Sequence, residues 1–200
     1  MNFKPRERDK YLTQAEFRQL ISWADRQGDP RAALFLFVGG AVGTRIGETR
    51  AMLWRDLARL TAERVIEVRC LKKRKRGGGR KEKIADVAID EKSAERIVGY
   101  IAQMGGPGRP DDPVFPGRSG PISHRQALTW AKRAMVGAGL NPNYSYHALR
   151  HYRGISLWKA SRDIELVKRQ LRHENATSTY KYMHMSDEEQ RANVEKVEVL

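Results

Sequence analysis

Cysteine and long apolar segments are what this sequence has least of. Its 200 residues include a single cysteine, Cys70, which excludes an internal disulfide and a zinc site built from several cysteines. No segment approaches the roughly 18 apolar residues that a membrane-spanning helix needs. Residues 1–10 are charged and contain no apolar core, so we expect a flexible polar segment there and no secretory signal. These features indicate a protein of a reducing compartment.

Acidic residues are scarce relative to basic ones. The chain has 24 Asp and Glu against 38 Lys and Arg, a formal net charge of +14. Such an excess predicts a polyanionic partner, most often nucleic acid. Charge alone does not separate a protein that acts on nucleic acid from a ribosomal or nucleoid-type protein that only neutralises phosphates. The motifs have to make that distinction.

Hydrophobic periodicity predicts a mostly helical chain interrupted by one β-hairpin. Thr13 and Glu16 form a capping box ahead of a first helix. The segment 31–42 is almost wholly apolar, which suits a central buried helix. Between 64 and 89, two alternating β-branched segments flank a basic run with three glycines at its tip, the pattern of a long hairpin. Other helices are expected from about 44, and over 91–104, 123–139, 147–159, 161–171 and 175–183.

His147 and Arg150 are three residues apart, so on a helix they share a face. Arginine offers a fork of donors and histidine can give or take a proton, a combination that suits a phosphate. The same two residues would also fit the end of an ordinary surface helix. The motif by itself leaves both readings open.

Arg45 stands at the expected start of a helix, in the segment 43–48. A positive charge there opposes the helix dipole, so it needs another reason to be present. A bound phosphate would supply one, with Glu48 one turn later holding the guanidinium from behind. The alternative is a plain ion pair between residues three apart.

Two tyrosines, Tyr180 and Tyr182, follow His173. On a helix, side chains two residues apart point about 200° away from each other, so only one of them can face a given site. Spacing does not choose between them, and a tyrosine is ordinarily an amphipathic packing residue.

Together and in this order, these motifs resemble the tyrosine recombinases, also called phage integrases. That family has an Arg in a G-x-R-x-x-E setting, a Lys on a β-hairpin, H-x-x-R, and a second His or Trp. Its nucleophilic Tyr comes nine residues after that His, often followed by x-H, which selects Tyr182 with His184 here. The resemblance covers about 11–184 and implies an α+β fold, a mostly helical catalytic domain with a small antiparallel sheet. It implies these catalytic residues: Arg45, Lys72, His147, Arg150, His173 and Tyr182. It also implies supporting roles for Glu48 and His151.

Two features depart from the family pattern. Arg172 stands where the family usually has a glycine, and we expect this to alter how the turn packs on DNA. The hairpin is longer and more basic than usual, so the catalytic lysine is ambiguous: Lys72 is favoured over Lys73, with Lys75 third, because the family's lysine comes four residues after a strand residue. The remaining basic residues of the hairpin are expected to contact the DNA backbone. They are Lys73, Arg74, Lys75, Arg76, Arg80, Lys81 and Lys83.

The resemblance implies site-specific DNA recombination through a 3′-phosphotyrosyl intermediate and a Holliday junction, with no metal or other cofactor. Arg45 and Arg150 would grip the phosphate. His147 would be the base for the Tyr182 phenol, and Lys72 would protonate the departing 5′ oxygen. His173 would donate a hydrogen bond to the phosphate. A type IB topoisomerase and a catalytically silent DNA-binding regulator remain the alternatives.

The implied partners are double-stranded DNA at a specific site and three further copies of the chain, as a tetramer on DNA and a monomer otherwise. The implied setting is the cytoplasm of a bacterium or archaeon, or a phage or mobile element. Residues 185–200 are expected to form a short helix and then a strand, docking in cis or on a neighbouring protomer. Most integrases carry an N-terminal helical domain, whereas the resemblance in this chain is to the catalytic domain. The chain is therefore expected to be either part of a longer integrase or a short stand-alone recombinase.

Overall fold

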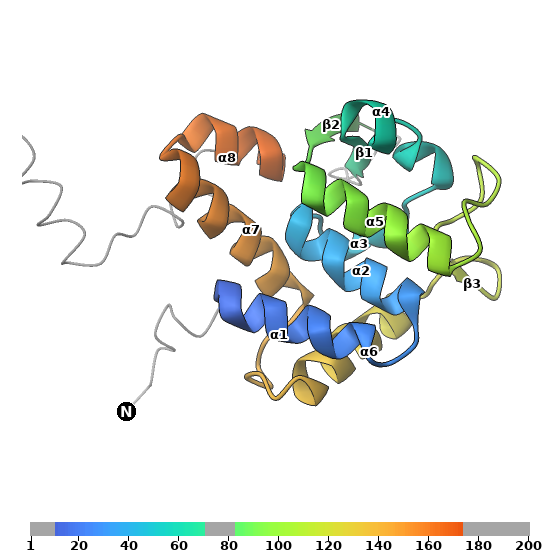
Figure 1. Ribbon diagram of the computed structural model, residues 1–200, viewed down its shortest axis with the longest axis horizontal. Helices are drawn as coiled ribbons and strands as arrows, with labels where there is room; N and C mark the ends of the chain where they lie inside the picture. The colour runs from blue at the N-terminus through green and yellow to red at the C-terminus, as the bar shows by residue number, and fades with distance from the viewer. Residues whose placement is uncertain (1–10, 71–82, 174–200) are drawn as a thin grey trace, which may run out of the picture.

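The structure, a computed structural model, describes residues 11–70 and 83–173 (Figure 1). Helices predominate in this part of the chain, and the longer strands form an antiparallel hairpin, so the predicted α+β fold is confirmed. Within the described ranges, no helix is both long and apolar enough to cross a membrane. The helix expected over 175–183 and the strand expected near the C-terminus lie outside the described residues.

The first helices begin where the sequence predicts. In the capping box ahead of α1 (Gln14–Asp25), the Thr13 amide donates to Glu16 Oε2 at 2.7 Å and the Glu16 amide donates to Thr13 Oγ1 at 3.1 Å. Asp29 caps α2 (Pro30–Ala41) by accepting from two amides of its first turn, and Pro30 occupies the first helical position. Residues 33–41 of α2 are all buried, which confirms the predicted central helix.

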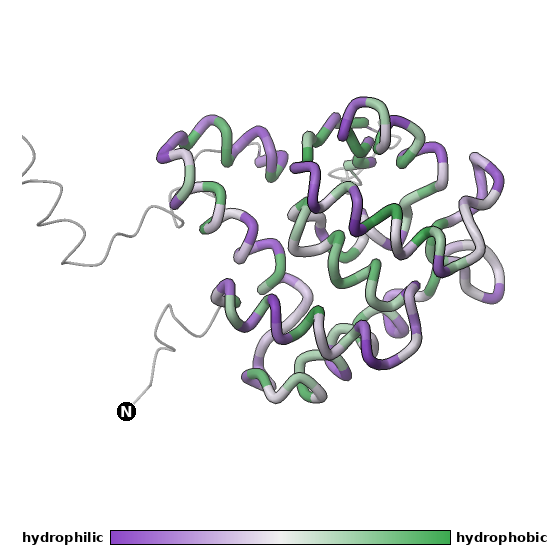
Figure 2. Tube along the Cα trace, viewed as in Figure 1, coloured by the Kyte–Doolittle hydropathy of each residue, from purple (hydrophilic) through white to green (hydrophobic). Residues whose placement is uncertain are grey.

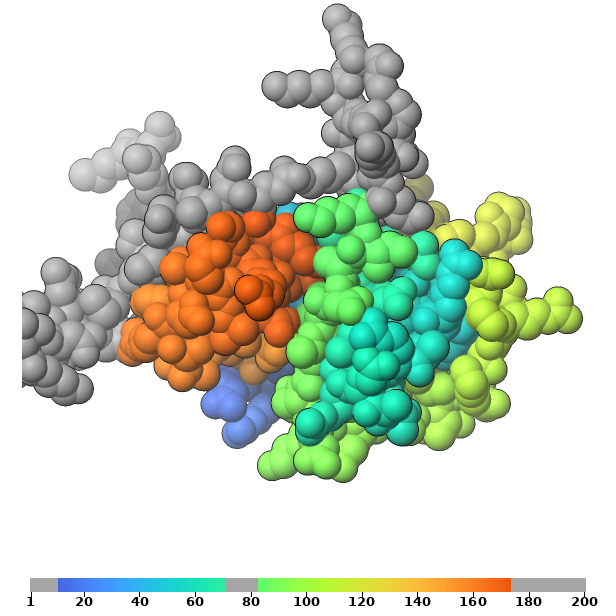
Figure 3. All heavy atoms as spheres, turned by 90° about the horizontal axis from the view of Figure 1, so that it is seen from above, coloured from blue at the N-terminus to red at the C-terminus, as the bar shows by residue number. Residues whose placement is uncertain are grey.

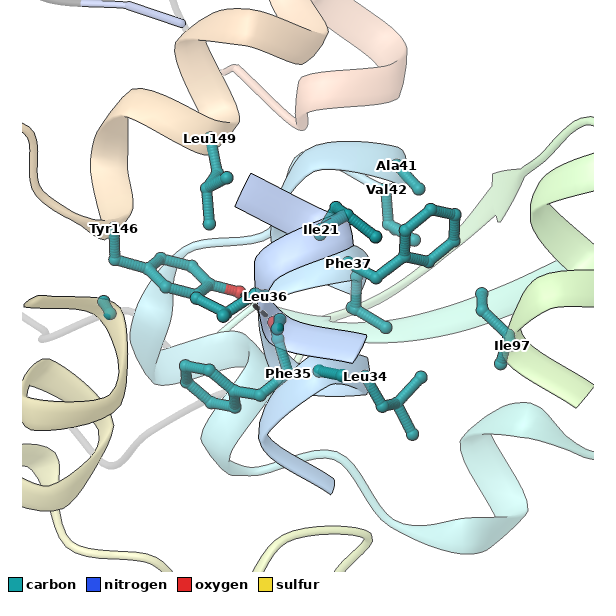
Figure 4. Close-up of a cluster of buried hydrophobic side chains, with 14 of the residues drawn as sticks. Ile21, Leu34, Phe35, Leu36, Phe37, Ala41, Val42, Ile97, Tyr146 and Leu149 are labelled. Carbon is teal, nitrogen blue, oxygen red and sulfur yellow. Dashed lines mark hydrogen bonds between the residues drawn. The ribbon is translucent and has the colours of Figure 1, made fainter. Parts of the chain in front are cut away.

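The hydrophobic core is built around α2, which packs against α1, α5 (Glu91–Gln103) and α7 (Tyr146–Ser161). Figure 2 shows α2 as a largely hydrophobic segment, and Figure 4 shows its side chains meeting those of its neighbours. Two glycines of α2 allow close approach. A Cβ on Gly39 would lie 2.7 Å from Tyr146 Oη, and one on Gly40 would lie 2.2 Å from Phe17 Cε2. The contact at Gly39 sets the position of α7.

The predicted hairpin is confirmed at its base. Strands β1 (Val65–Cys70) and β2 (Lys83–Ala88) pair antiparallel, from Val65 opposite Ala88 to Cys70 opposite Lys83. Arg69 of β1 forms a buried ion pair with Asp56, at 2.7 Å from Nη2 to Oδ1. Asp56 belongs to the short helix η2 (Trp54–Leu57) and accepts from the amide of its N-cap, Leu53, so this pair ties β1 to η2. The tip, residues 71–82, lies outside the described residues.

The later helices agree with the predicted segments, while several short elements were not predicted. The predicted ones are α3 (Ile46–Arg50), α5, α6 (His124–Gly137), α7 and α8 (Ile164–Leu171). Those missed are η2, α4 (Leu60–Glu63), β3 (Pro116–Gly117) and β4 (Gly120–Pro121). Each of these spans four residues or fewer, too few for a hydrophobic period to show.

Helix α8 is set apart from the main core. Its buried residues, Val167 and Leu171, form a small cluster with partly buried side chains of α7. Figure 1 shows α8 beside the far end of α7, and in Figure 3 the surface of these two helices adjoins that of β2 and α5. Gln170 makes one such contact, donating from Nε2 to the Ala88 carbonyl at 3.3 Å.

Candidate active site

The start of α7 is fixed by Tyr146, whose ring lies over Gly39. Its hydroxyl is 2.6 Å from Thr49 Oγ1 and 3.3 Å from Thr44 Oγ1, and it donates to the Phe35 carbonyl at 3.2 Å. Burial raises the pKa of this phenol, with hydrogen bonds from the two threonines only partly opposing the rise. The group therefore stays protonated, and it fastens α7 to α2 and α3 immediately before the H-x-x-R motif.

Arg150 lies one turn further along α7 and is buried, with 1% of its surface exposed. Its Nη1 donates to the Gly43 carbonyl at 2.6 Å, and its Nη2 donates to the Leu171 carbonyl. One guanidinium therefore joins three parts of the fold: α7, the turn between α2 and α3, and the end of α8.

Arg45 and Glu48 lie at the start of α3. The Arg45 amide donates to Glu48 Oε2 at 2.8 Å, and Arg45 Nη1 lies 2.6 Å from Glu48 Oε1. The Arg45 side chain is 46% exposed, whereas that of Glu48 is 3% exposed. Glu48 thus holds the guanidinium from the protein side, as expected, and leaves the other side of Arg45 towards solvent.

Glu48 is shared by further arginines. Arg150 Nη1 lies 3.8 Å from Glu48 Oε2, and Arg172 Nη2 lies 3.0 Å from the same atom. Burial would raise the pKa of Glu48, but the charge of Arg172, the Arg45 amide and the other guanidinium groups outweigh it and lower the pKa. Glu48 is therefore ionised at neutral pH. Three guanidinium groups around one carboxylate leave a surplus of two positive charges, which suits a bound anion.

His147 and His151 lie one turn apart on α7, where His147 is exposed and His151 is half-buried. Their rings are 4.5 Å apart between centroids and meet edge to face, at 85°. His147 is exposed while Arg150 is buried, so the two motif residues occupy adjoining turns at different depths. The expected supporting residue His151 thus contacts the ring of His147.

Arg172 ends α8 in the left-handed conformation, with φ at +55°. Its amide donates to the Arg169 carbonyl, and the His173 amide donates to the Lys168 carbonyl, each at 3.0 Å. This is the turn that usually favours glycine. The Arg172 side chain is 4% exposed and points into the protein. The expected effect of this residue on how the turn packs on DNA stays a prediction.

The structure brings together Arg45, Glu48 and Arg150, with the turn that carries His173 next to them. Lys83 is exposed at the start of β2. The other predicted site residues lie outside the described part of the chain: Lys72, Lys73, Arg74, Lys75, Arg76, Arg80, Lys81 and Tyr182. In the part that is described, no group of three or more His, Cys, Asp or Glu side chains is arranged to hold a metal ion.

Sequence reasoning missed the role of Tyr146 and the inward direction of the Arg172 side chain. Tyr146 directly precedes His147, but nothing local shows that its partner is a glycine more than a hundred positions earlier. Arg172 was noticed as a departure from a glycine position. Its inward direction depends on Glu48 and the Gly43 carbonyl, which are distant in sequence.

Comparisons with known proteins identify the family of this chain and support its fold. Residues 10–189 match the sequence profile of the Phage integrase family. The tyrosine recombinase XerD of Corynebacterium glutamicum is 33% identical over 69 residues, which are 34% of this chain and 23% of XerD. The crystal structure of XerA recombinase superposes with a TM-score of 0.73 at 22% identity, over 100% of this chain and 68% of that one.

Two further solved structures share the fold. XerH recombinase bound to its difH substrate gives a TM-score of 0.73 at 18% identity, over 94% of this chain and 53% of that chain. The Tn1549 transposon integrase in complex with circular intermediate DNA gives 0.73 at 19% identity, over 98% and 68%. The chain thus spans about half to two thirds of the length of these solved relatives. Since the family profile covers nearly the whole sequence, the chain belongs to the phage integrase family.

Proposed function

We propose that residues 11–184 are the catalytic domain of a tyrosine-type site-specific DNA recombinase. The observation that carries this proposal is the cluster in which Arg45 and Arg150 share the buried carboxylate of Glu48. A phosphodiester is anionic and repels nucleophiles. Two guanidinium groups held at a fixed separation can bind its non-bridging oxygens and offset the charge that grows in the transition state.

In the proposed reaction, the Tyr182 phenolate attacks phosphorus and forms a 3′-phosphotyrosyl bond, while the 5′ oxygen departs. His147 accepts the phenolic proton, and Lys72 gives a proton to the departing oxygen. His173 donates a hydrogen bond to the phosphate. Attack by the 5′-hydroxyl of a second strand on the phosphotyrosyl bond reverses the step and releases Tyr182. Because the bond energy is kept in the covalent intermediate, the exchange needs neither ATP nor a metal.

The proposed partner is double-stranded DNA at a specific site, bound by four copies of the chain. Strand exchange within this assembly would proceed through a Holliday junction. A net charge of +14 supports a polyanionic partner. The solved relatives XerH and the Tn1549 integrase were both captured with DNA, which supports the same class of partner here. The basic residues of the hairpin are proposed to contact the DNA backbone.

The test is covalent capture on DNA. A half-site is first selected from a random duplex library by binding, and a nick is then placed beside the cleaved phosphate so that the cut strand diffuses away. The wild-type chain should form an adduct that survives SDS. Tyr182→Phe should bind equally and form none, while Tyr180→Phe should still cleave.

Other outcomes would replace the proposal. Binding without any adduct would identify a DNA-binding regulator. An adduct with relaxation of supercoiled DNA, but no strand exchange between two sites, would identify a topoisomerase. An adduct that is lost in Tyr180→Phe and kept in Tyr182→Phe would move the nucleophile.

A further inference from the structure

Helix α8 is attached to the rest of the domain by an apolar cluster and by hydrogen bonds. Its apolar residues pack on α7 in a cluster separate from the main core. Towards the turn between α2 and α3, its end is held by hydrogen bonds from Arg150 and Arg172. The position of His173, just after α8, therefore depends on these two guanidinium groups.

Arg172 makes three side-chain hydrogen bonds to acceptors in this region. Nη2 donates to the Gly43 carbonyl and to Glu48 Oε2, both at 3.0 Å, and Nη1 donates to the Gln170 carbonyl at 2.7 Å. The Gly43 carbonyl belongs to the turn that leads into α3, the Glu48 carboxylate belongs to α3, and the Gln170 carbonyl belongs to α8. The guanidinium therefore bridges the two elements.

The turn before α3 and the end of α8 are also closely packed. Gly43 has φ at +71°, and a Cβ on it would lie 2.6 Å from Leu171 Cδ2. The turn at Gly43 therefore packs closely against α8, and the hydrogen bonds of Arg172 hold it in that position.

The inward direction of Arg172 is not a consequence of its backbone conformation. Arg64 and Arg162 end α4 and α7 with φ at +55° and +53°, and both of these residues are exposed. Three arginines thus occupy the same kind of helix end. Arg172 has acceptors inside the protein within reach, and its side chain is 4% exposed.

We propose that Arg172 is a positioning residue for the reaction: its guanidinium fixes the turn that carries His173 against the cluster of Arg45, Glu48 and Arg150. This rests on the proposed recombinase function. Arg172 itself does not touch the phosphate in this proposal. It acts through Glu48 and through the turn before His173, in place of the glycine that the resemblance leads one to expect there.

The test separates binding from chemistry in the full chain. Arg172→Gly keeps a residue that favours the left-handed turn but removes the bridge. DNA affinity is measured by fluorescence anisotropy, and the single-turnover cleavage rate is measured at saturating protein on the nicked half-site. We expect affinity within about twofold of wild type and cleavage about 10- to 100-fold slower, the range for a displaced catalytic group. Arg172→Lys retains the charge and one donor group, and should recover part of the rate.

Arg64→Gly is the matched control. It makes the same replacement in the same backbone conformation and removes the same charge, at an exposed position on α4. Its cleavage rate should equal that of wild type. Melting temperatures of all variants set an assay temperature at which each is folded, and if Arg172→Gly does not fold, Arg172→Lys alone decides.

The proposal is overturned if Arg172→Gly, or Arg172→Lys where that variant decides, cleaves at the wild-type rate. It is also overturned if affinity and cleavage fall by the same factor, because a loss of folded protein or of DNA contacts would do that. Absence of an adduct with the wild-type chain would refute the recombinase function itself, which is a different result from a wild-type adduct with unchanged variants.

Discussion

Arg150 and Arg172 donate hydrogen bonds to the same carbonyl oxygen, that of Gly43, from Nη1 at 2.6 Å and from Nη2 at 3.0 Å. Two buried cations are therefore held side by side. The shared carboxylate of Glu48 offsets the repulsion between the two positive charges, since it lies 3.8 Å from Arg150 and 3.0 Å from Arg172. With Arg45 as a third partner, the site keeps a positive surplus that an anion would complete.

Glu48→Gln should therefore destabilise the protein in the absence of DNA. It keeps the shape of the side chain and leaves the buried arginines without a counter-charge, which typically costs about 3–5 kcal/mol. Urea denaturation gives the loss. Sulfate should restore more stability to Glu48→Gln than to wild type, because an anion can replace the missing charge. An equal gain in both proteins would reflect the general stabilising effect of sulfate and would contradict an anion site here.

The same carboxylate makes stability depend on acidic pH. The folded-state pKa of Glu48 is lowered from its ordinary value of 4.5. Its contribution is therefore complete above about pH 4.5 and is lost as the pH falls through the lower folded value. The difference in unfolding free energy between wild type and Glu48→Gln should shrink over that window. In Arg172→Gln the loss should be smaller and should end at a higher pH, because the largest charge that holds the folded-state pKa of Glu48 below its ordinary value is gone. Parallel pH curves for wild type and Glu48→Gln would show that Glu48 does not titrate in this way.

Local patterns in the sequence predicted much of the fold. The capping box at Thr13, the apolar α2 and the two alternating strands each carry their signal within about a dozen residues, and all were found. The candidate site was predicted through the motif order, and the ion pair of Arg45 with Glu48 follows from a spacing of three. The bridge from Arg172 to Gly43 joins residues 129 positions apart, and no period or spacing encodes such a contact.

The packing of α7 on α2 can be tested with two glycine-to-alanine substitutions that should change stability in opposite directions. Gly39→Ala places a Cβ 2.7 Å from Tyr146 Oη and 2.9 Å from Leu149 Cδ1, so α7 must shift. Stability should fall by about 1–3 kcal/mol, and cleavage should slow because α7 carries His147. Gly99→Ala on α5 has no neighbour within 4 Å. It should instead raise stability by about 0.5–1 kcal/mol and leave cleavage unchanged. Thermal and urea unfolding measure both, and a stabilised Gly39→Ala would contradict the close contact.

The basic hairpin should make DNA binding depend steeply on salt. Eight Lys and Arg residues stand between 72 and 83 against one acidic residue, Glu82. Each phosphate contact contributes about 0.9 to the slope of log affinity against log salt. Replacing Arg74, Lys75, Arg76 and Arg80 by alanine should weaken binding and lower that slope by up to about 3.6, in anisotropy titrations over a range of NaCl.

Lys72→Ala is the contrasting variant, because its proposed role is chemical. It should slow cleavage with little change in affinity, and a bridging 5′-phosphorothiolate should restore the rate, since sulfur departs without needing a proton. Rescue of Lys73→Ala but not of Lys72→Ala would assign the acid to Lys73. An unchanged salt slope in the fourfold variant would place the contacted phosphates elsewhere on the domain.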